Sequence, residues 1–201
     1  MKKATRQFTK EHNIRLVLMT IFQHDNLSRA DIARITDLTP TTVSDIVADL
    51  IEEGMVNETG IGASLGGKPP IQVSLVEDSR CLIGLDLTRD KFYGAIVNLR
   101  GKIREMADLP VANGDSDMSL APVYEILDRL MAAASQRPVG IGVGTPGLVN
   151  TQEGVVIDAV NLNWKNLPLG QLLQERYGLP AYVLNDSQAA AIGEFNYGDS
   201  H

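Results

Sequence analysis

The chain has 201 residues, of which 44% are hydrophobic and 21% charged, so it can bury a core and is not disordered by composition. Its formal net charge of −7 argues against a protein that coats nucleic acid or anionic lipid over its whole surface. The single cysteine, Cys81, excludes an internal disulfide framework and a multi-cysteine zinc site. There is no membrane-length apolar run and no signal-type segment, so we expect a cytoplasmic protein without a membrane partner.

Basic side chains gather at the start of this acidic chain. Residues 1–15 hold Lys2, Lys3, Arg6, Lys10 and Arg15 against a single acid, Glu11. Such a basic arm is either a contact for an acidic partner or the solvated start of a helix. The elements that follow favour the first interpretation.

Two helices are predicted directly after the arm. Apolar residues recur at helical spacing from Asn13 to Phe22, which indicates one amphipathic helix. Ser28 stands three residues before Asp31, an acidic variant of the capping box, and predicts the start of a short helix that runs to Ile35.

A third helix is predicted from Thr39, with Pro40 at its first position and Gly54 after its end. Two short helices joined by a tight turn are typical of a helix-turn-helix, whose second helix enters the DNA major groove. Three-helix cores also occur in protein-binding modules. The outward face of the predicted third helix carries Thr41, Thr42, Ser44 and Asp45.

A predicted hairpin favours the DNA-binding alternative. Residues 55–59 and 71–75 alternate apolar and polar side chains, as strands do, around a glycine-rich loop at residues 60–70. A helix-turn-helix followed by a hairpin resembles a winged helix, although a hairpin can also lack a partner. The residues expected to contact DNA are Lys3, Arg6, Ser28, Arg29, Thr39, Thr41, Thr42, Ser44 and Lys68.

The sequence pattern changes after Val76, so we predict two domains, residues 1–76 and 77–201. The second begins with three strands and a helix, followed by another buried strand that ends near Gly144. Strands 81–86, 92–98, 103–109 and 139–144 and helix 122–134 have this order. The predicted fold class is α/β, multi-domain, with the second part resembling a lobe of the actin-like, ribonuclease-H-like kinases.

Two longer motifs follow. One is residues 142–150, with companions at 154–156 and 161–164, and the other is residues 185–194. Together they resemble the ROK family of repressors, open reading frames and sugar kinases. With a winged helix in front, the chain is similar to that family's sugar-responsive repressors, such as those for xylose or N-acetylglucosamine.

The second motif offers the chemistry of a sugar site. Asn185 supplies an amide and Asp186 a carboxylate directly after the apolar strand 181–184, at the edge where α/β sheets bind ligands. The resemblance adds Gly147 and Asn161 to the sugar-binding residues and makes Asp186 the position of the kinases' general base. Without the motif, Asn185 would be interpreted as a helix N-cap.

The sequence departs from the kinases at their phosphate loop. The resemblance aligns their Asp-x-Gly-Gly-Thr loop with residues 86–90, where both glycines are absent and Asp90 adds negative charge. We therefore expect no ATP turnover, no catalytic residue and a vestigial role for Asp186. Cys81 is expected to be a small core residue and not a metal ligand.

The second departure is length. The sequence stops at His201, before the family's second lobe and its cysteine-rich zinc site, so we expect no cofactor or metal and an incomplete, truncated sugar lobe. The predicted function is a sugar-controlled, DNA-binding repressor that forms a homodimer or higher homo-oligomer. Its partners would be operator DNA and a sugar or sugar phosphate. A sugar kinase with an appended head and a protein-interaction module are the alternatives.

Overall fold

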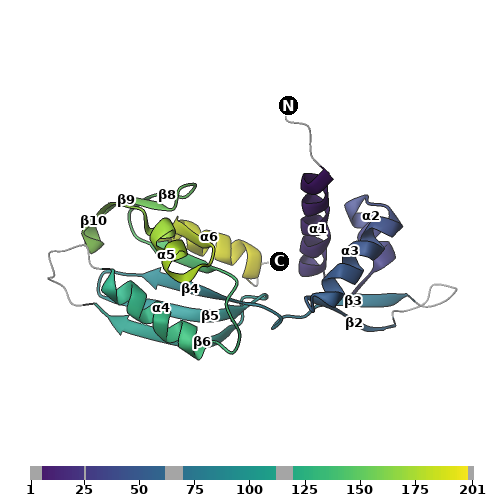
Figure 1. The fold of residues 1–201 in the computed structure, drawn as a ribbon, viewed down its shortest axis with the longest axis horizontal. Coiled ribbons are helices and arrows are strands. Elements are labelled where there is room, and N and C mark those ends of the chain that lie inside the picture. Colours follow the sequence, from purple (N-terminus) through teal and green to yellow (C-terminus); the bar gives the residue numbers. More distant parts are fainter. Residues whose placement is uncertain (1–5, 25, 62–69, 112–119, 199–201) are drawn as a thin grey trace. The chain divides into compact units, whose positions relative to one another are not determined.

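The computed structural model describes residues 6–24, 26–61, 70–111 and 120–198 (Figure 1). The chain divides into two compact units, Met1–Ser79 and Arg80–His201, here called unit 1 and unit 2. No helix in the described part of the chain has the length and apolar character that crossing a membrane requires.

Unit 1 consists of three helices and a small antiparallel sheet of strand order β1-β3-β2. The helices are α1 (Arg6–Gln23), α2 (Arg29–Thr36) and α3 (Pro40–Glu52), and the strands are β1 (Leu27–Ser28), β2 (Val56–Ile61) and β3 (Ile71–Leu75). Aliphatic side chains from all three helices and from β3 form the core. Val17, Ile21, Ile32, Val43, Val47 and Val73 are completely buried.

The helix-turn-helix elements form where the sequence predicts them. A residue in left-handed conformation, Asp37 (φ 56°), ends α2, and α3 starts at Pro40 as expected. Helix α1 differs, since it begins at Arg6 and not at Asn13. Residues 7–12 are exposed and carry no apolar stripe, so periodicity could not detect that first part of the helix.

Unit 2 is built on a five-stranded mixed sheet of order β11-β7-β4-β5-β6. Strand β4 pairs in parallel with β7 and β7 in parallel with β11, whereas β4-β5 and β5-β6 are antiparallel. The carboxyl ends of β4, β7 and β11 therefore lie at one edge. The strands are β4 (Cys81–Leu87), β5 (Lys91–Asn98), β6 (Ile103–Pro110), β7 (Ile141–Thr145) and β11 (Ala181–Asn185).

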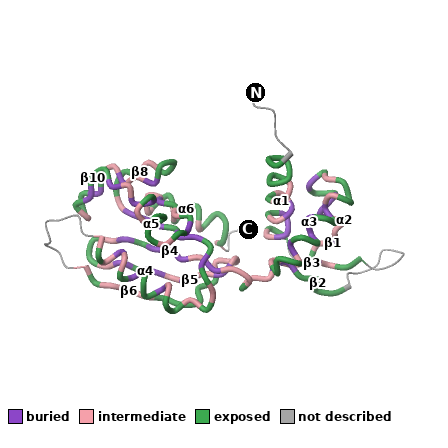
Figure 2. Tube along the Cα trace, in the orientation of Figure 1, coloured by how far each residue is buried: buried purple, intermediate pink, exposed green. Residues whose placement is uncertain are grey.

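Helices lie on both faces of this sheet. Helix α4 (Ala121–Ala133) packs on β5 and β6, and α5 (Leu169–Tyr177) contacts β11. Helix α6 (Asp186–Tyr197) covers the opposite face, where Ala189 lies beside Gly144. Val123, Ile126, Leu127 and Leu130 of α4 are buried, whereas no residue of α6 is, and the colours of the tube in Figure 2 follow this contrast in burial.

A second small sheet follows β7. It has the order β10-β9-β8 and consists of β8 (Leu148–Asn150), β9 (Val155–Ala159) and β10 (Trp164–Leu167), with a 3-10 turn at Val160–Leu162. None of these elements was predicted from the sequence, and neither was α5. Trp164, the chain's one tryptophan, is 2% exposed in the unit 2 core. Its fluorescence will therefore report unfolding of unit 2.

Cys81 lies in the unit 2 core, as the sequence suggests. It is 6% exposed, its sulfur lies 3.5 Å from the carbonyl of Gln136, and burial raises the pKa of the thiol. A buried thiol with a raised pKa is mostly protonated at neutral pH and is a poor metal ligand.

Candidate functional site

Helix α3 presents two chemically different faces. Val43, Ile46, Val47 and Leu50 are buried in the unit 1 core. Thr41 and Ser44 on the other side are exposed, and Thr42 is half-buried. The predicted hydroxyl face is thus open to a partner at the helix N-terminus, where the backbone amides give a partial positive charge.

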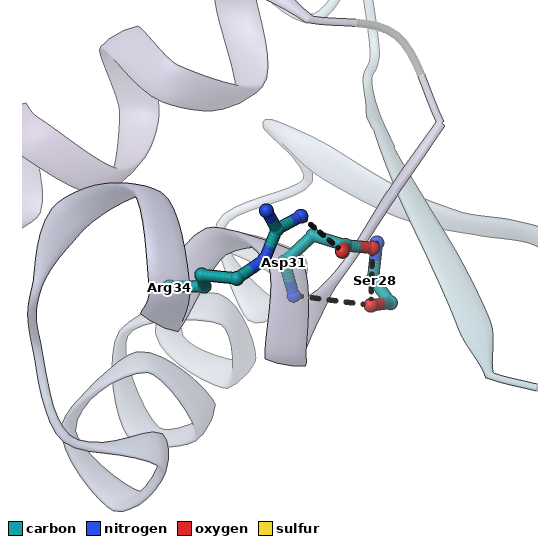
Figure 3. Close-up of polar contacts among 3 residues, drawn as sticks. All are labelled: Ser28, Asp31 and Arg34. Carbon is teal, nitrogen blue, oxygen red and sulfur yellow. Dashed lines mark hydrogen bonds and ion pairs between the residues drawn. The ribbon is translucent and has the colours of Figure 1, made fainter.

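Two of the predicted DNA contacts cap helices. Ser28 is 4% exposed, accepts a hydrogen bond from the backbone N–H of Asp31 (3.2 Å) and donates one to its carboxylate (2.6 Å; Figure 3). The prediction for Ser28 is corrected, because its hydroxyl is buried and used within unit 1. Thr39 caps α3 by accepting from the N–H of Thr42 at 3.2 Å, but it remains exposed.

The cap of α2 should carry measurable stability. Ser28 lowers the pKa of Asp31 by hydrogen bonding, and Arg34 adds to this effect at 2.9 Å. We expect Ser28→Ala to lower the free energy of unfolding of unit 1 by about 1 kcal/mol. Because the pKa of Asp31 is lowered in the folded state, its ionised carboxylate stabilises unit 1. This contribution is fully present above pH 3.8 and is lost as the pH falls through the lower pKa of the folded state.

Chemical denaturation followed by far-UV circular dichroism, repeated between pH 7 and pH 3, measures this loss. Ser44→Ala is the control, since Ser44 is exposed and caps nothing. Equal stability losses in the two variants would contradict the assigned role of Ser28.

The basic residues predicted to contact DNA are only partly described. Arg29 forms an ion pair with Glu58 on β2, with its Nη2 3.0 Å from Oε1, and so links α2 to the hairpin. Arg6 begins α1, but its side chain lies outside the described part of the structure, as do Lys3 and Lys68. Their DNA contacts remain predictions.

The carboxyl edge of the unit 2 sheet brings together three of the four predicted sugar-binding residues. Asn185 ends β11 beside Thr145 of β7, Asp186 follows it, and Gly147 lies in the turn after β7. The side-chain amide of Asn185 donates to the carbonyl oxygen of Gly147 at 2.9 Å. The fourth residue, Asn161, is exposed in the 3-10 turn after β9.

Gly147 occupies a position that only glycine fits. Its φ is 94°, and a Cβ atom built there would lie 2.1 Å from the carbonyl oxygen of Asp158 and 2.8 Å from the Cα of Ala159. The missing side chain lets the turn after β7 pack directly on the end of β9. Gly147 therefore fixes the wall of the site next to Asn185.

Of the two interpretations that the sequence left open for Asn185, the structure confirms the helix N-cap, and sugar binding stays a prediction. Asn185 is the N-cap of α6, because its Oδ1 accepts from the backbone N–H groups of Ser187 (3.0 Å) and Gln188 (3.4 Å). Because Oδ1 bonds the helix and one side-chain N–H bonds the carbonyl oxygen of Gly147, the side chain of Asn185 connects α6 to the β7–β8 turn. Its main observed role is to hold the site together.

Two carboxylates face one region of this edge. Asp86 is the last but one residue of β4 and pairs with Gly144 of β7. Its side chain is exposed, but partial desolvation, followed by the charge of Asp186, raises its pKa. One oxygen of Asp186 accepts from the backbone N–H of Ser187 at 2.6 Å. In the sequence, Asp86 stands out only as the first residue of the segment that the resemblance aligns with the kinases' phosphate loop, and the structure adds it to the candidate site.

The charge of Asp86 should oppose folding. Because its pKa is raised in the folded state, protonated Asp86 favours folding. This contribution to stability is fully present below pH 3.8 and is lost as the pH rises through the pKa of the folded state. At pH 7 we expect Asp86→Asn to raise the free energy of unfolding of unit 2 by a few tenths of a kcal/mol, because the exposed group is well screened. The difference should disappear at pH 3. Urea titrations read by Trp164 fluorescence test this, and a variant less stable at pH 7 would contradict it.

The lost phosphate loop is a closed hairpin turn. Both the backbone N–H (3.2 Å) and the hydroxyl of Thr88 bond the carbonyl oxygen of Lys91 and so close the β4–β5 connection. Arg89 and Asp90 are exposed at its tip, with Nε of Arg89 4.0 Å from Oδ1 of Asp90. This turn lacks the glycines that let backbone amides cradle a nucleotide phosphate, and Asp90 adds negative charge beside Arg89.

The described residues hold no group of three or more His, Cys, Asp or Glu side chains arranged for a metal ion. Asp86 and Asp186 present carboxylate oxygens, and such oxygens accept hydrogen bonds from hydroxyl groups such as those of a polyol.

The fold and the two sites define a class of protein in which a winged helix-turn-helix precedes an α/β lobe with a polar site at its sheet edge. A winged helix-turn-helix DNA-binding model matches residues 11–57, and the ROK family model matches residues 82–201. The chain belongs to the ROK family.

Its relatives include both repressors and kinases. A xylose repressor of Caldicellulosiruptor bescii is 34% identical over 94% of this chain and 49% of the repressor. A glucokinase of Streptomyces coelicolor is 31% identical over 58% of this chain and 36% of the kinase. The solved structure of a ROK transcriptional regulator, described as a homologue of Escherichia coli Mlc, superposes with a TM-score of 0.78 over 92% of this chain and 48% of the regulator, at 28% identity.

The repressors match both units, whereas the glucokinase match covers little more than half of the chain. The chain spans about half the length of the curated repressors that it matches.

Proposed function

We propose that the chain acts in a transcriptional repressor of carbohydrate genes. Unit 1 binds double-stranded operator DNA, and the edge of the unit 2 sheet contributes to the site for a sugar or sugar phosphate. The observation that carries the proposal is the hydroxyl-bearing N-terminal face of α3, which is open opposite a buried apolar stripe. The match of both units to repressors supports it.

The chemistry of α3 suits the major groove. In a helix-turn-helix, the N-terminal residues of the second helix contact base edges. Thr41 and Ser44 offer hydroxyl groups that both donate and accept, and the positive helix end favours nearby phosphates. Thr39, an exposed cap at the same end, lies within reach of the DNA backbone in this arrangement.

The repressor acts as a homodimer in this proposal. Two α3 helices separated by about 34–36 Å reach successive major grooves on one side of the duplex. A sugar that binds better to the state with a different spacing shifts the population away from DNA. This is the simplest link between a sugar site in unit 2 and DNA release by unit 1.

The DNA-binding test starts from a random duplex library, because the operator is unknown. The chain should select specific sequences and bind them more weakly as salt rises. We expect a Thr41→Ala/Ser44→Ala double variant to bind the selected duplex roughly tenfold more weakly or worse. Thr151→Ala, which removes an exposed hydroxyl in unit 2, is the matched control. Absent or salt-independent binding by a folded chain would contradict the proposal.

The sugar site is tested separately, with the 201-residue chain and a panel of monosaccharides. A bound sugar raises the unfolding midpoint of unit 2, read by Trp164 fluorescence. The stabilisation grows with the logarithm of one plus the sugar concentration divided by its dissociation constant. Asp186→Asn should remove the shift, whereas Asp90→Asn in the β4–β5 turn should keep it. A panel without any shift would contradict sugar binding by this lobe.

We also propose that the chain is not a kinase. The closed turn between Thr88 and Lys91 supports this, since it replaces the loop that would hold nucleotide phosphates. Asp186 remains at the general-base position without that loop. A coupled assay should find no sugar-dependent ATP consumption, and consumption that Asp186→Asn abolishes would reverse this conclusion.

A further inference from the structure

The outermost ridge of α3 carries a carboxylate. At 100° per residue, the buried stripe around Leu50 lies opposite a line through Thr41, Asp45 and Ala48. Asp45 lies one turn after Thr41 and is exposed, so it belongs to the face that unit 1 offers to DNA. Its side chain makes no hydrogen bond or ion pair with any residue that the structure describes.

A carboxylate at this place would oppose DNA binding unless it finds a donor. Helix α3 contains no basic side chain. Lys10 of α1, which lines the same groove as Asp45, has its Nζ 3.8 Å from the carboxylate of Asp49. Near phosphates, an unpaired Asp45 adds like-charge repulsion. In the major groove, however, base edges present amino groups that a carboxylate can accept from.

Cytosine suits this carboxylate better than the other bases. An ionised carboxylate only accepts hydrogen bonds, and guanine and thymine present acceptors in the major groove. Adenine offers its N6 amino group beside the acceptor N7, which repels the second carboxylate oxygen. Cytosine offers its N4 amino group without an acceptor beside it on the same base.

We propose that Asp45 is a specificity-determining residue that reads the N4 amino group of one cytosine in each operator half-site. This inference rests on the proposed DNA-binding function and deepens it. Thr41 and Ser44 tolerate several bases because hydroxyl groups both donate and accept hydrogen bonds. The carboxylate of Asp45 only accepts, so it can distinguish between bases where the hydroxyl groups cannot.

The test compares duplexes selected from one random library by the 201-residue wild type, Asp45→Asn and Asp49→Asn. Asparagine pairs with adenine through N6 and N7, so Asp45→Asn should change one cytosine per half-site to adenine. We expect the cytosine-to-adenine affinity ratio at that position to fall roughly 5- to 100-fold. Asp49→Asn removes the same charge one turn further along α3 and should leave every base preference unchanged.

The possible outcomes separate the role of Asp45 from the proposed DNA-binding function. If Asp45→Asn selects the same sequences as wild type, with affinity raised or lowered uniformly, Asp45 acts only as a charge and the inference is overturned, while the proposed function stands. If wild type selects no sequence although circular dichroism shows it folded, the proposed function itself fails. A base change shared by Asp49→Asn would also overturn the assignment to Asp45.

Discussion

Gly147→Ala should destabilise unit 2 by about 3 kcal/mol or more, because two costs act together. Alanine is strained at a φ of 94°, and its Cβ would lie 2.1 Å from the carbonyl oxygen of Asp158. The turn after β7 would have to move away from β9, which would also stretch the hydrogen bond from Asn185 to the Gly147 carbonyl. Urea denaturation read by Trp164 fluorescence gives the loss directly.

Gly142→Ala in the adjoining strand β7 is the matched control. A Cβ at Gly142 meets nothing within 4 Å, and its φ lies outside the positive range. We expect this variant to be neutral or more stable by up to about 1 kcal/mol, since alanine loses less backbone entropy on folding. Similar losses in both variants would show that the contact with Asp158 does not determine the effect.

Phe92→Ala is the second substitution with a large expected effect. Phe92 lies in β5, is 2% exposed and belongs to the core between the sheet and α4. Removing its ring should lower the free energy of unfolding of unit 2 by about 3–5 kcal/mol, through lost apolar burial and the cavity left behind. The fluorescence midpoint of Trp164 is again the measurement.

Its control is the next residue along the strand. Tyr93 points to the opposite face, is 40% exposed and has the Nζ of Lys91 5.2 Å from its ring centre. Tyr93→Ala should cost about 1 kcal/mol or less, because its ring is only partly withdrawn from water. If Tyr93→Ala were the more damaging variant, the assignment of the two faces of β5 would be wrong.

Local signals decided which elements the sequence could predict. Thr39 and Pro40 mark the start of α3 because both act within one turn of chain. Helix α5 was missed because Pro168 precedes it without a side-chain cap and the helix has only nine residues. Strand β10 was missed because it has four residues, and both Asn163 before it and Asn166 within it adopt positive φ.

The candidate site shows a similar division. The motif around Asn185 predicted which residues lie together at the sheet edge, and the alternative role of Asn185 as a helix cap was correct. Sugar binding by these residues stays a prediction. Asp86 was missed as a neighbour of Asp186, since their proximity depends on the parallel arrangement of β4, β7 and β11, which brings distant residues to one edge. Ser28 was assigned to DNA although its hydroxyl was needed for the cap that the sequence itself predicts.

In the proposed sugar site, ligand binding and local order would compete for the same side-chain atoms of Asn185. Its oxygen accepts hydrogen bonds from the first turn of α6, and one of its two N–H groups donates to the carbonyl oxygen of Gly147. A single N–H donor is therefore left for a ligand. A ligand that forms a second hydrogen bond with this side chain must replace one of its internal hydrogen bonds. Such an exchange would loosen either the helix start or the neighbouring turn, so occupancy would register as a change in the amide hydrogen exchange of Ser187 and of residues 146–148.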